Sequence, residues 1–288
     1  MRIKRWIYFI LIIYIVQYII SIGLDYCFLQ SSIYKSAVMN SELDELSKKD
    51  ILIFGGSNGL VSFDNKILED RLNSDVYNLS EDDTNLKLHL LQLKYLISHS
   101  VKPKVIILAL GSMDNGLSRN SLRYLPYFST NRELSKAYKE FQSTEYYSFK
   151  IFPIFKWAKY NNDLLYPTLF STLYKKNYRH RFDENGDYEY PVLLSKIESS
   201  HEDVKLDSTN PDLKQFMNLC ESNGIRLVTV NTPYYDKKIN WDMSQNDVLN
   251  YSEVYKLRDD LFYDDSHLNK LGKLEFSKMI ADSLSKIL

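Results

Sequence analysis

Apolar runs and amphipathic stretches alternate along most of the chain. Continuous apolar runs, typical of buried parallel strands, occupy 50–56, 76–79, 104–110 and 225–231. Between and after them, apolar residues recur at helical spacing in 60–72, 84–98, 212–222 and from about 268 to the end. Strands that alternate with helices predict the α/β class with a parallel sheet. In such sheets, active sites lie outside the carboxyl ends of the strands.

The N-terminus carries a different pattern. From Trp6 to Leu24 there is no charge, and only Gln17, Ser21 and Gly23 interrupt the apolar run. As a helix this run is about 28 Å long, close to the ~30 Å bilayer core. Basic residues precede it, so we expect residues 1–25 to be a single-pass anchor in the cell membrane, with the soluble domain on the extracytoplasmic side. The alternative is a cleaved signal peptide, but Gly23-Leu24-Asp25-Tyr26-Cys27 offers no small-residue cleavage pattern.

Residues 26–48 are polar and mixed, which predicts a stalk before an α/β domain at 49–288. Of the two cysteines, Cys27 falls at the outer membrane interface, and Cys220 lies on an apolar helical stripe typical of a buried thiol. A disulfide between them is compatible with an extracytoplasmic location, but nothing in the sequence requires it.

The segment 117–200 interrupts the alternation of strands and helices. It holds 19 aromatic residues among 84 and 13 basic against 9 acidic residues. The segment therefore resembles a helical insertion that packs its own aromatic core. The functional alternative is a lid or platform that stacks on sugars or touches lipid headgroups, because Tyr and Trp combine an apolar face with a polar tip.

Overall charge and glycine content refine this picture. The formal net charge is −1, which argues against a general nucleic-acid binder. There are only nine glycines in 288 residues, and five fall in two clusters, 55–59 and 111–116. Both clusters follow predicted strands, where sharp turns need residues without a side chain.

The first cluster, Gly55-Gly56-Ser57-Asn58-Gly59, predicts a tight turn from strand to helix that exposes the Ser57 hydroxyl. The helix N-terminus also directs its N–H groups and dipole to this point. The simpler interpretation is that Ser57 caps the following helix.

A partner for Ser57 occurs 210 residues later, in Asp264-Asp265-Ser266-His267. His267 has a carboxylate three residues before it, in a loop that opens the last helix. A base that takes the serine proton and a carboxylate that orients the base are the requirements of nucleophilic catalysis. One alternative is a solvated loop in which Asp264 or Asp265 caps the helix. Another is a metal site, but we find no further cluster with ligand spacing and expect no metal.

Together these blocks resemble the SGNH (GDSL-like) hydrolase superfamily over residues 50–116 and 211–288. The resemblance implies a three-layer α/β/α fold with a flavodoxin-like parallel sheet. It also implies Ser57 as nucleophile, His267 as base and Asp264 as its orienting carboxylate. The oxyanion would be held by the N–H groups of Ser57 and Ser80, with Asn115 as a substitute for the family's usual asparagine.

The sequence departs from the family at two oxyanion positions: Ser80 replaces a glycine, and Met113 replaces the asparagine whose amide donates. Losing one such donor typically costs about 10²–10³ in rate. These departures are similar to those of the membrane-anchored branch that acts in polysaccharide O-acetylation and teichoic-acid D-alanyl transfer. Its members work with a multi-spanning membrane O-acyltransferase, so such a protein is the expected partner.

The resemblance implies a serine acyltransferase or esterase that acts on O-acyl groups of a cell-envelope polysaccharide or related polymer. The alternative function is a non-catalytic SGNH-like polymer-binding or assembly module. A further alternative takes Gly55-x-Ser57-x-Gly59 as the nucleophile elbow of an α/β-hydrolase, which normally follows several strands. The glycine spacing fits neither a dinucleotide fingerprint nor a P-loop, and we expect no cofactor.

Overall fold

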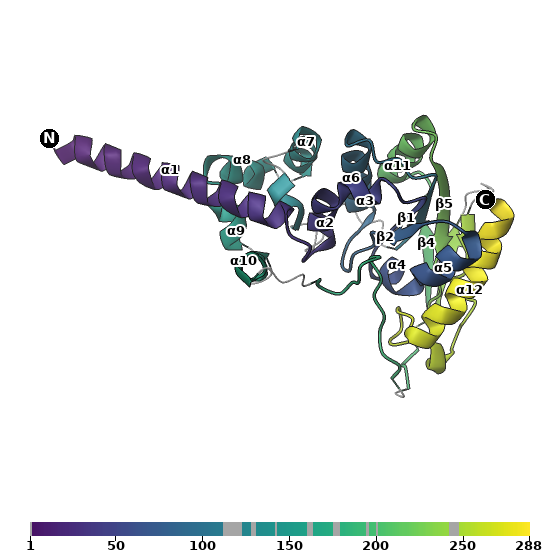
Figure 1. Ribbon diagram of the computed structural model, residues 1–288. Helices are drawn as coiled ribbons and strands as arrows, with labels where there is room; N and C mark the ends of the chain where they lie inside the picture. The colour runs from purple at the N-terminus through teal and green to yellow at the C-terminus, as the bar shows by residue number, and fades with distance from the viewer. Residues whose placement is uncertain are drawn as a thin grey trace. The chain divides into compact units, whose positions relative to one another are not determined.

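The computed structural model describes residues 2–111, 123–127, 131–141, 143–159, 164–174, 179–193, 196–199, 201–241 and 248–288 (Figure 1). These residues form two compact units. The first unit comprises Met1–Glu42 and Ser121–His180, and the second comprises Leu43–Asn120 and Arg181–Leu288. Each unit is therefore built from segments that are distant in the sequence.

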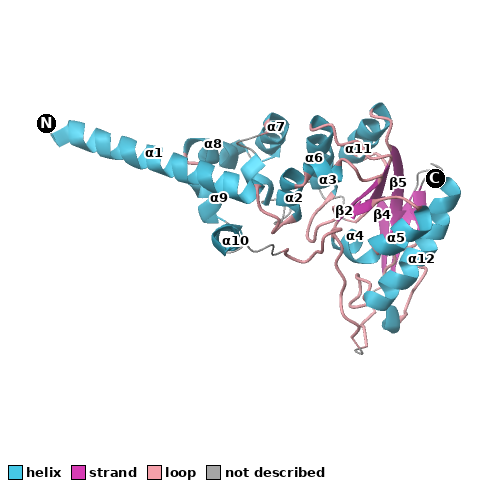
Figure 2. Cartoon of the chain, viewed as in Figure 1, coloured by secondary structure: helices cyan, strands magenta, loops and turns pink. Residues whose placement is uncertain are grey.

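A five-stranded parallel sheet forms the centre of the second unit (Figure 2). The strands, in chain order, are β1 (Ile51–Gly55), β2 (Val76–Asn78), β3 (Val105–Ala109), β5 (Arg226–Asn231) and β7 (Val248–Asn250). Their order across the sheet is β2-β1-β3-β5-β7. Every residue of β1 and β3 is buried, as their continuous apolar sequences predict. The predicted α/β class with a parallel sheet is confirmed.

Helices pack on this sheet through alternating strand positions. Ile51 and Ile53 of β1 lie in one buried cluster with Phe276 and Ile280 of α12 (Lys270–Ile287). Phe54, which points to the opposite face because strand side chains alternate, contacts Phe216 in an edge-to-face pair with centroids 5.8 Å apart. Phe216 belongs to α11 (Pro211–Ser222), which packs against α6 (Leu86–Ser98).

The predicted helix over 60–72 is two helices in the structure. They are α4 (Ser57–Ser62) and α5 (Asn65–Leu72). Phe63 leaves the helical conformation, and the side chain of Asp64 accepts a hydrogen bond from the N–H of Ile67, which starts α5 anew.

Two short strands outside the main sheet, β4 (Glu202–Leu206) and β6 (Lys237–Trp241), pair with each other in parallel. The sequence pattern predicted neither of them, nor β7. The β4 and β6 strands are short and mostly polar, and β7 has only three residues, so none of them carries the long apolar run of a buried strand.

The first unit is helical. Its longest helix is α1 (Arg2–Leu29), which is long and apolar enough to cross a membrane. The α2 helix (Lys35–Ser41) follows. Glu42 alone separates it from α3 (Leu43–Leu46), which belongs to the second unit. Residues 33–39 are buried, so this part of the predicted stalk packs within the unit instead of extending through solvent.

The rest of the first unit consists of helices from the aromatic segment. They are α7 (Arg132–Phe141), α8 (Ser143–Ile151), α9 (Ile154–Lys159) and α10 (Tyr166–Tyr174). Both α9 and α10 contact α1. The predicted insertion, 117–200, thus divides between the units: its helical part packs with α1, whereas residues from Arg181 onward belong to the α/β unit.

Candidate active site

Ser57 lies at the carboxyl end of β1, one residue beyond the last glycine before α4. Gly56 occupies the N-cap position of α4 without a side chain to cap it, and Ser57 is the first residue of that helix. Gly55 allows β3 to come close, because a Cβ atom at this position would lie 2.9 Å from the Cβ of Ala109. The interpretation of Ser57 as the helix cap is therefore wrong, since Gly56 occupies that position and the Ser57 hydroxyl has another partner.

That partner is His267. The Nε2 atom of His267 lies 2.7 Å from the hydroxyl oxygen of Ser57. The other ring nitrogen, Nδ1, lies 2.8 Å and 2.9 Å from the two carboxylate oxygens of Asp264. The fold thus brings the three residues that the sequence singled out into one chain of hydrogen bonds, although 210 positions separate Ser57 from His267.

Asp264 is held by the loop that it belongs to. Its Oδ1 accepts hydrogen bonds from the backbone N–H groups of Ser266 at 2.9 Å and His267 at 2.8 Å. Burial disfavours the charged carboxylate, but the hydrogen bonds from His267 and Ser266 outweigh it and hold the pKa of Asp264 below its ordinary value. An ionised Asp264 accepts a hydrogen bond from Nδ1–H of His267, and this tautomer leaves the Nε2 lone pair to accept a hydrogen bond from the Ser57 hydroxyl.

The last helix is capped by Asn269, so the alternative of Asp264 or Asp265 as its cap is wrong. The side-chain oxygen of Asn269 accepts from the N–H groups of Leu271 and Gly272, at 2.9 Å and 3.1 Å. Its amide nitrogen donates to the backbone carbonyls of Asp260 and Phe262. This fully buried side chain therefore ties the His267 loop to the start of α12. Asn269 was not among the residues predicted for the site.

The strand order places this site at a switch point of the sheet. From β1 the chain crosses to β2 on one side and then to β3 on the other. The carboxyl ends of β1 and β3 consequently border the crevice in which ligands of doubly wound sheets bind. Gly55 and Ala109, the last residues of these strands, are register partners. Ser57 lies two residues beyond Gly55 and is half-buried, and the His267 side chain is 20% exposed, so both are accessible from solvent.

No protein-family model and no curated protein sequence matches this chain. The site is thus characterised by its own geometry.

The predicted oxyanion donors have different positions. The N–H of Ser57 is the first of α4, where the helix supplies no carbonyl acceptor. The N–H of Ser80 donates to the side-chain oxygen of Asn78 at 2.9 Å, and the Asn78 amide donates to the carbonyl of Gly59. In this structure Ser80 N–H is therefore directed at Asn78. Asn115 and Met113 lie outside the described residues.

Two tyrosines that the sequence analysis did not single out border the histidine. Tyr190 stacks on Tyr263 with ring centroids 4.3 Å apart and meets the His267 ring edge-on at 5.6 Å. The guanidinium of Arg181 lies 6.0 Å from the centroid of the Tyr190 ring and forms an ion pair with Asp82. Tyr190 is one of many aromatic residues in the 117–200 segment, and its backbone bridge to Asn269 brings it to the site.

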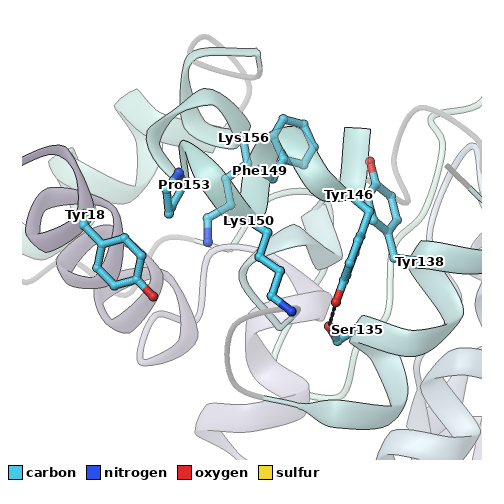
Figure 3. A pocket seen from close by; sticks show the side chains of 8 residues that line it. All are labelled: Tyr18, Ser135, Tyr138, Tyr146, Phe149, Lys150, Pro153 and Lys156. Carbon is cyan, nitrogen blue, oxygen red and sulfur yellow. Dashed lines mark hydrogen bonds between the residues drawn. The ribbon is translucent and has the colours of Figure 1, made fainter. Parts of the chain in front are cut away.

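A pocket of about 260 Å³ lies elsewhere, in the first unit (Figure 3). The side chains that line it are Tyr18, Ser135, Tyr138, Tyr146, Phe149, Lys150, Pro153 and Lys156. None of the predicted catalytic residues lines it. Among the described parts of the chain, no group of three or more His, Cys, Asp or Glu side chains has a geometry suited to a metal ion.

Proposed function

We propose that the protein is a membrane-anchored serine acyltransferase or esterase that acts through a Ser57 acyl-enzyme. The single observation that carries this proposal is the hydrogen-bonded chain Ser57–His267–Asp264, with distances of 2.7 Å and 2.8 Å. A partly exposed serine held in this way is an activated nucleophile. A structural serine at a helix start does not need a base that is itself oriented by a carboxylate.

In the proposed reaction, Ser57 attacks the carbonyl carbon of an ester while Nε2 of His267 takes the hydroxyl proton. The tetrahedral intermediate collapses, and the leaving alkoxide takes that proton from His267. The acyl group now forms an ester with Ser57. A second hydroxyl, from a sugar or from water, then gives its proton to His267 and attacks this ester, which regenerates Ser57. Asp264 stabilises the imidazolium in both halves.

We further propose that the second unit is an SGNH-type three-layer α/β/α domain. The contacts of α12 and α11 with opposite faces of β1, and the strand order, support this assignment. The proposed substrate is an O-acylated cell-envelope polysaccharide or a related polymer, with a multi-spanning O-acyltransferase as partner. The proposed location is the extracytoplasmic side of the membrane, with α1 as anchor. The apolar length of α1 and the basic residues at its start support that orientation.

A serine-reactive fluorophosphonate probe tests the nucleophile. We expect the full-length protein to be labelled and the Ser57→Ala variant to remain unlabelled. Ser266→Ala is the matched control, because this serine belongs to the same loop as His267 but contacts neither ring nitrogen in the hydrogen bonds described above. If the folded wild-type protein does not react, the acyl-enzyme proposal fails.

The second candidate is a non-catalytic polymer-binding module on the same fold. It is favoured by the Ser80 N–H, which is engaged with Asn78 and so is not directed at the space beside Ser57. In that case polymer binding would be equal for the wild type and Ser57→Ala, and neither would transfer an acyl group.

A further inference from the structure

The helices α9 and α10, with the end of α8, present an apolar surface to the outside of the first unit. We call this surface the apolar collar. Its residues are Ile151, Phe152, Phe155, Leu169, Phe170 and Leu173. Phe170 is 54% and Leu173 76% exposed, which is unusual for large apolar side chains grouped on neighbouring helices. By contrast, Arg132, Lys136 and Lys139 of α7 in the same unit are exposed and basic.

The collar contacts α1 well inside its apolar run. The Phe152 ring meets the Tyr14 ring edge-on, with centroids 6.2 Å apart. The backbone N–H of Ile154 donates to the side-chain oxygen of Gln17 at 3.2 Å. Tyr14 precedes Leu24, the end of the uncharged run, by ten residues, or about 15 Å of helix. If α1 needs the whole run from Trp6 to Leu24 to cross a ~30 Å core, the collar lies at hydrocarbon depth.

The polar positions of α1 face the neighbouring helices of the first unit, which pair with Asp25 and with the side-chain oxygen of Gln17. Gln17, Ser21 and Asp25 follow one another at intervals of four residues and thus share one side of the helix. Asp25 is buried, forms an ion pair with Lys156, and accepts a hydrogen bond from the indole N–H of Trp157 at 2.9 Å. Since charged and polar groups are costly in hydrocarbon unless they are paired, this arrangement suits a lipid environment. The side chains of the collar, by contrast, are exposed.

The border of the collar carries residue types that are typical of a membrane interface. Tyr146 and Lys150 of α8 line the pocket in Figure 3, opposite Tyr18 of α1. The ammonium group of Lys150 lies 5.6 Å from the centroid of the Tyr146 ring. Tyrosines favour the headgroup region, and a lysine can extend its charged end toward that region from an apolar site.

We propose that the apolar collar is embedded in the outer leaflet of the bilayer around α1, with lipid acyl chains as its occupant. The protein would then be held in the membrane by α1 and by the helices that carry the apolar collar, which together limit the tilt of the anchor. This inference rests on the proposed span by α1. It does not depend on the chemistry of Ser57.

Spin labels on the full-length protein in phosphatidylcholine vesicles, at high lipid-to-protein ratio, test the proposal. Labels are placed at Phe155→Cys and Phe170→Cys, with Ile13→Cys of α1 as a reference for lipid and Lys136→Cys for water. All variants carry Cys27→Ser, and the remaining thiol, Cys220, is 1% exposed and escapes labelling. Collisions with oxygen, which dissolves in lipid, are compared with collisions with a water-soluble nickel chelate.

We expect positions 155 and 170 to behave like 13, with frequent oxygen collisions and a loss of nickel collisions, and position 136 to show the reverse. If 13 is lipid-exposed but 155 and 170 collide with nickel, the collar is in water and the proposal is wrong, while the anchor stands. If 13 also collides with nickel, both the anchor and the collar are refuted. Low collision rates with both reagents at 155 and 170 mean that protein covers the collar, which also refutes lipid as its occupant.

Discussion

Replacing Asp264 by Asn tests whether the carboxylate charge activates Ser57 through His267. Asn has nearly the same shape, and its side-chain oxygen can still accept the N–H groups of Ser266 and His267 that Asp264 accepts at 2.9 Å and 2.8 Å. The loop that carries His267 is therefore expected to keep its conformation. What disappears is the negative charge beside Nδ1, which stabilises the imidazolium that forms when Ser57 is deprotonated.

The structure limits the size of this effect. The Asp264 side chain is 42% exposed, so water partly screens the charge. Opposite charges about 4 Å apart interact by roughly 1 kcal/mol in water and roughly 4 kcal/mol at an effective dielectric constant of 20. At about 1.4 kcal/mol per factor of ten, we expect Asp264→Asn to slow the reaction of Ser57 between about 5-fold and 10³-fold. This is less than the ~10⁴-fold loss reported for a buried triad aspartate.

The assay is the second-order rate constant for labelling of Ser57 by a fluorophosphonate at neutral pH. Asp265→Asn is the matched control, because Asp265 is the next residue and its carboxylate bonds to the Ser266 hydroxyl and not to His267. We expect this variant to react at the wild-type rate. Equal rates for wild type and Asp264→Asn, or an equal loss in Asp265→Asn, would show that the carboxylate does not act through His267.

Three further predictions concern stability, measured by denaturant unfolding of the full-length protein in detergent micelles. Gly272→Ala should lower the free energy of unfolding by about 1–3 kcal/mol, although Ala has the better helix propensity, because the new Cβ would lie 2.2 Å from the backbone carbonyl oxygen of Leu261. Gly111→Ala is the control, and we expect no loss there because no atom of the described residues lies within 4 Å of the added Cβ. Asn269→Ala should lower the free energy of unfolding by about 2–3 kcal/mol, since it removes a buried helix cap and leaves two backbone carbonyls without their donor. A loss below about 0.5 kcal/mol, which is typical of a surface substitution, would contradict this. Burial raises the pKa of Asp187 to about 6, above its value in the unfolded chain. The contribution of Asp187 to stability is therefore fully present below the unfolded pKa and is lost as pH rises through 6, so the free energy of unfolding should fall with pH in this range. Asp187→Asn should flatten this pH dependence between about pH 4 and 7, and an unchanged dependence would assign it to other groups.

Much of the α/β unit was predictable because its strands are buried on both faces. The runs at 50–56, 104–110 and 225–231 are β1, β3 and β5 in the structure, with boundaries shifted by at most one residue. The hydrophobic pattern did not predict features that do not depend on a run of buried apolar residues. Helix α5 starts at a side-chain cap by Asp64 and not at a break in periodicity. The β7 strand is only three residues long and is defined by its pairing with β5.

The predicted stalk and insertion show a second limit of prediction from sequence. Residues 33–39 are mixed in polarity, and their burial depends on helices from 121–180 that pack over them. Likewise, nothing in the local sequence distinguishes Tyr190 from the other tyrosines of its segment. It borders His267 because its backbone pairs with Asn269. Such long-range contacts have no periodic signature.

The sequence by itself determined the types and the chemistry of the parts: an uncharged run long enough for a bilayer, apolar strands that end in glycines, and a serine, a histidine and an aspartate in turn-forming contexts. Local composition carries these features because hydrophobic spacing and glycine freedom act over a few residues. Only the tertiary structure decided that Nε2 of His267 lies 2.7 Å from the Ser57 hydroxyl, that Ser80 N–H is directed at Asn78, and that Gln17 and Asp25 face inward from α1. These arrangements depend on which distant segments pack together, and that is set by the burial of the whole chain.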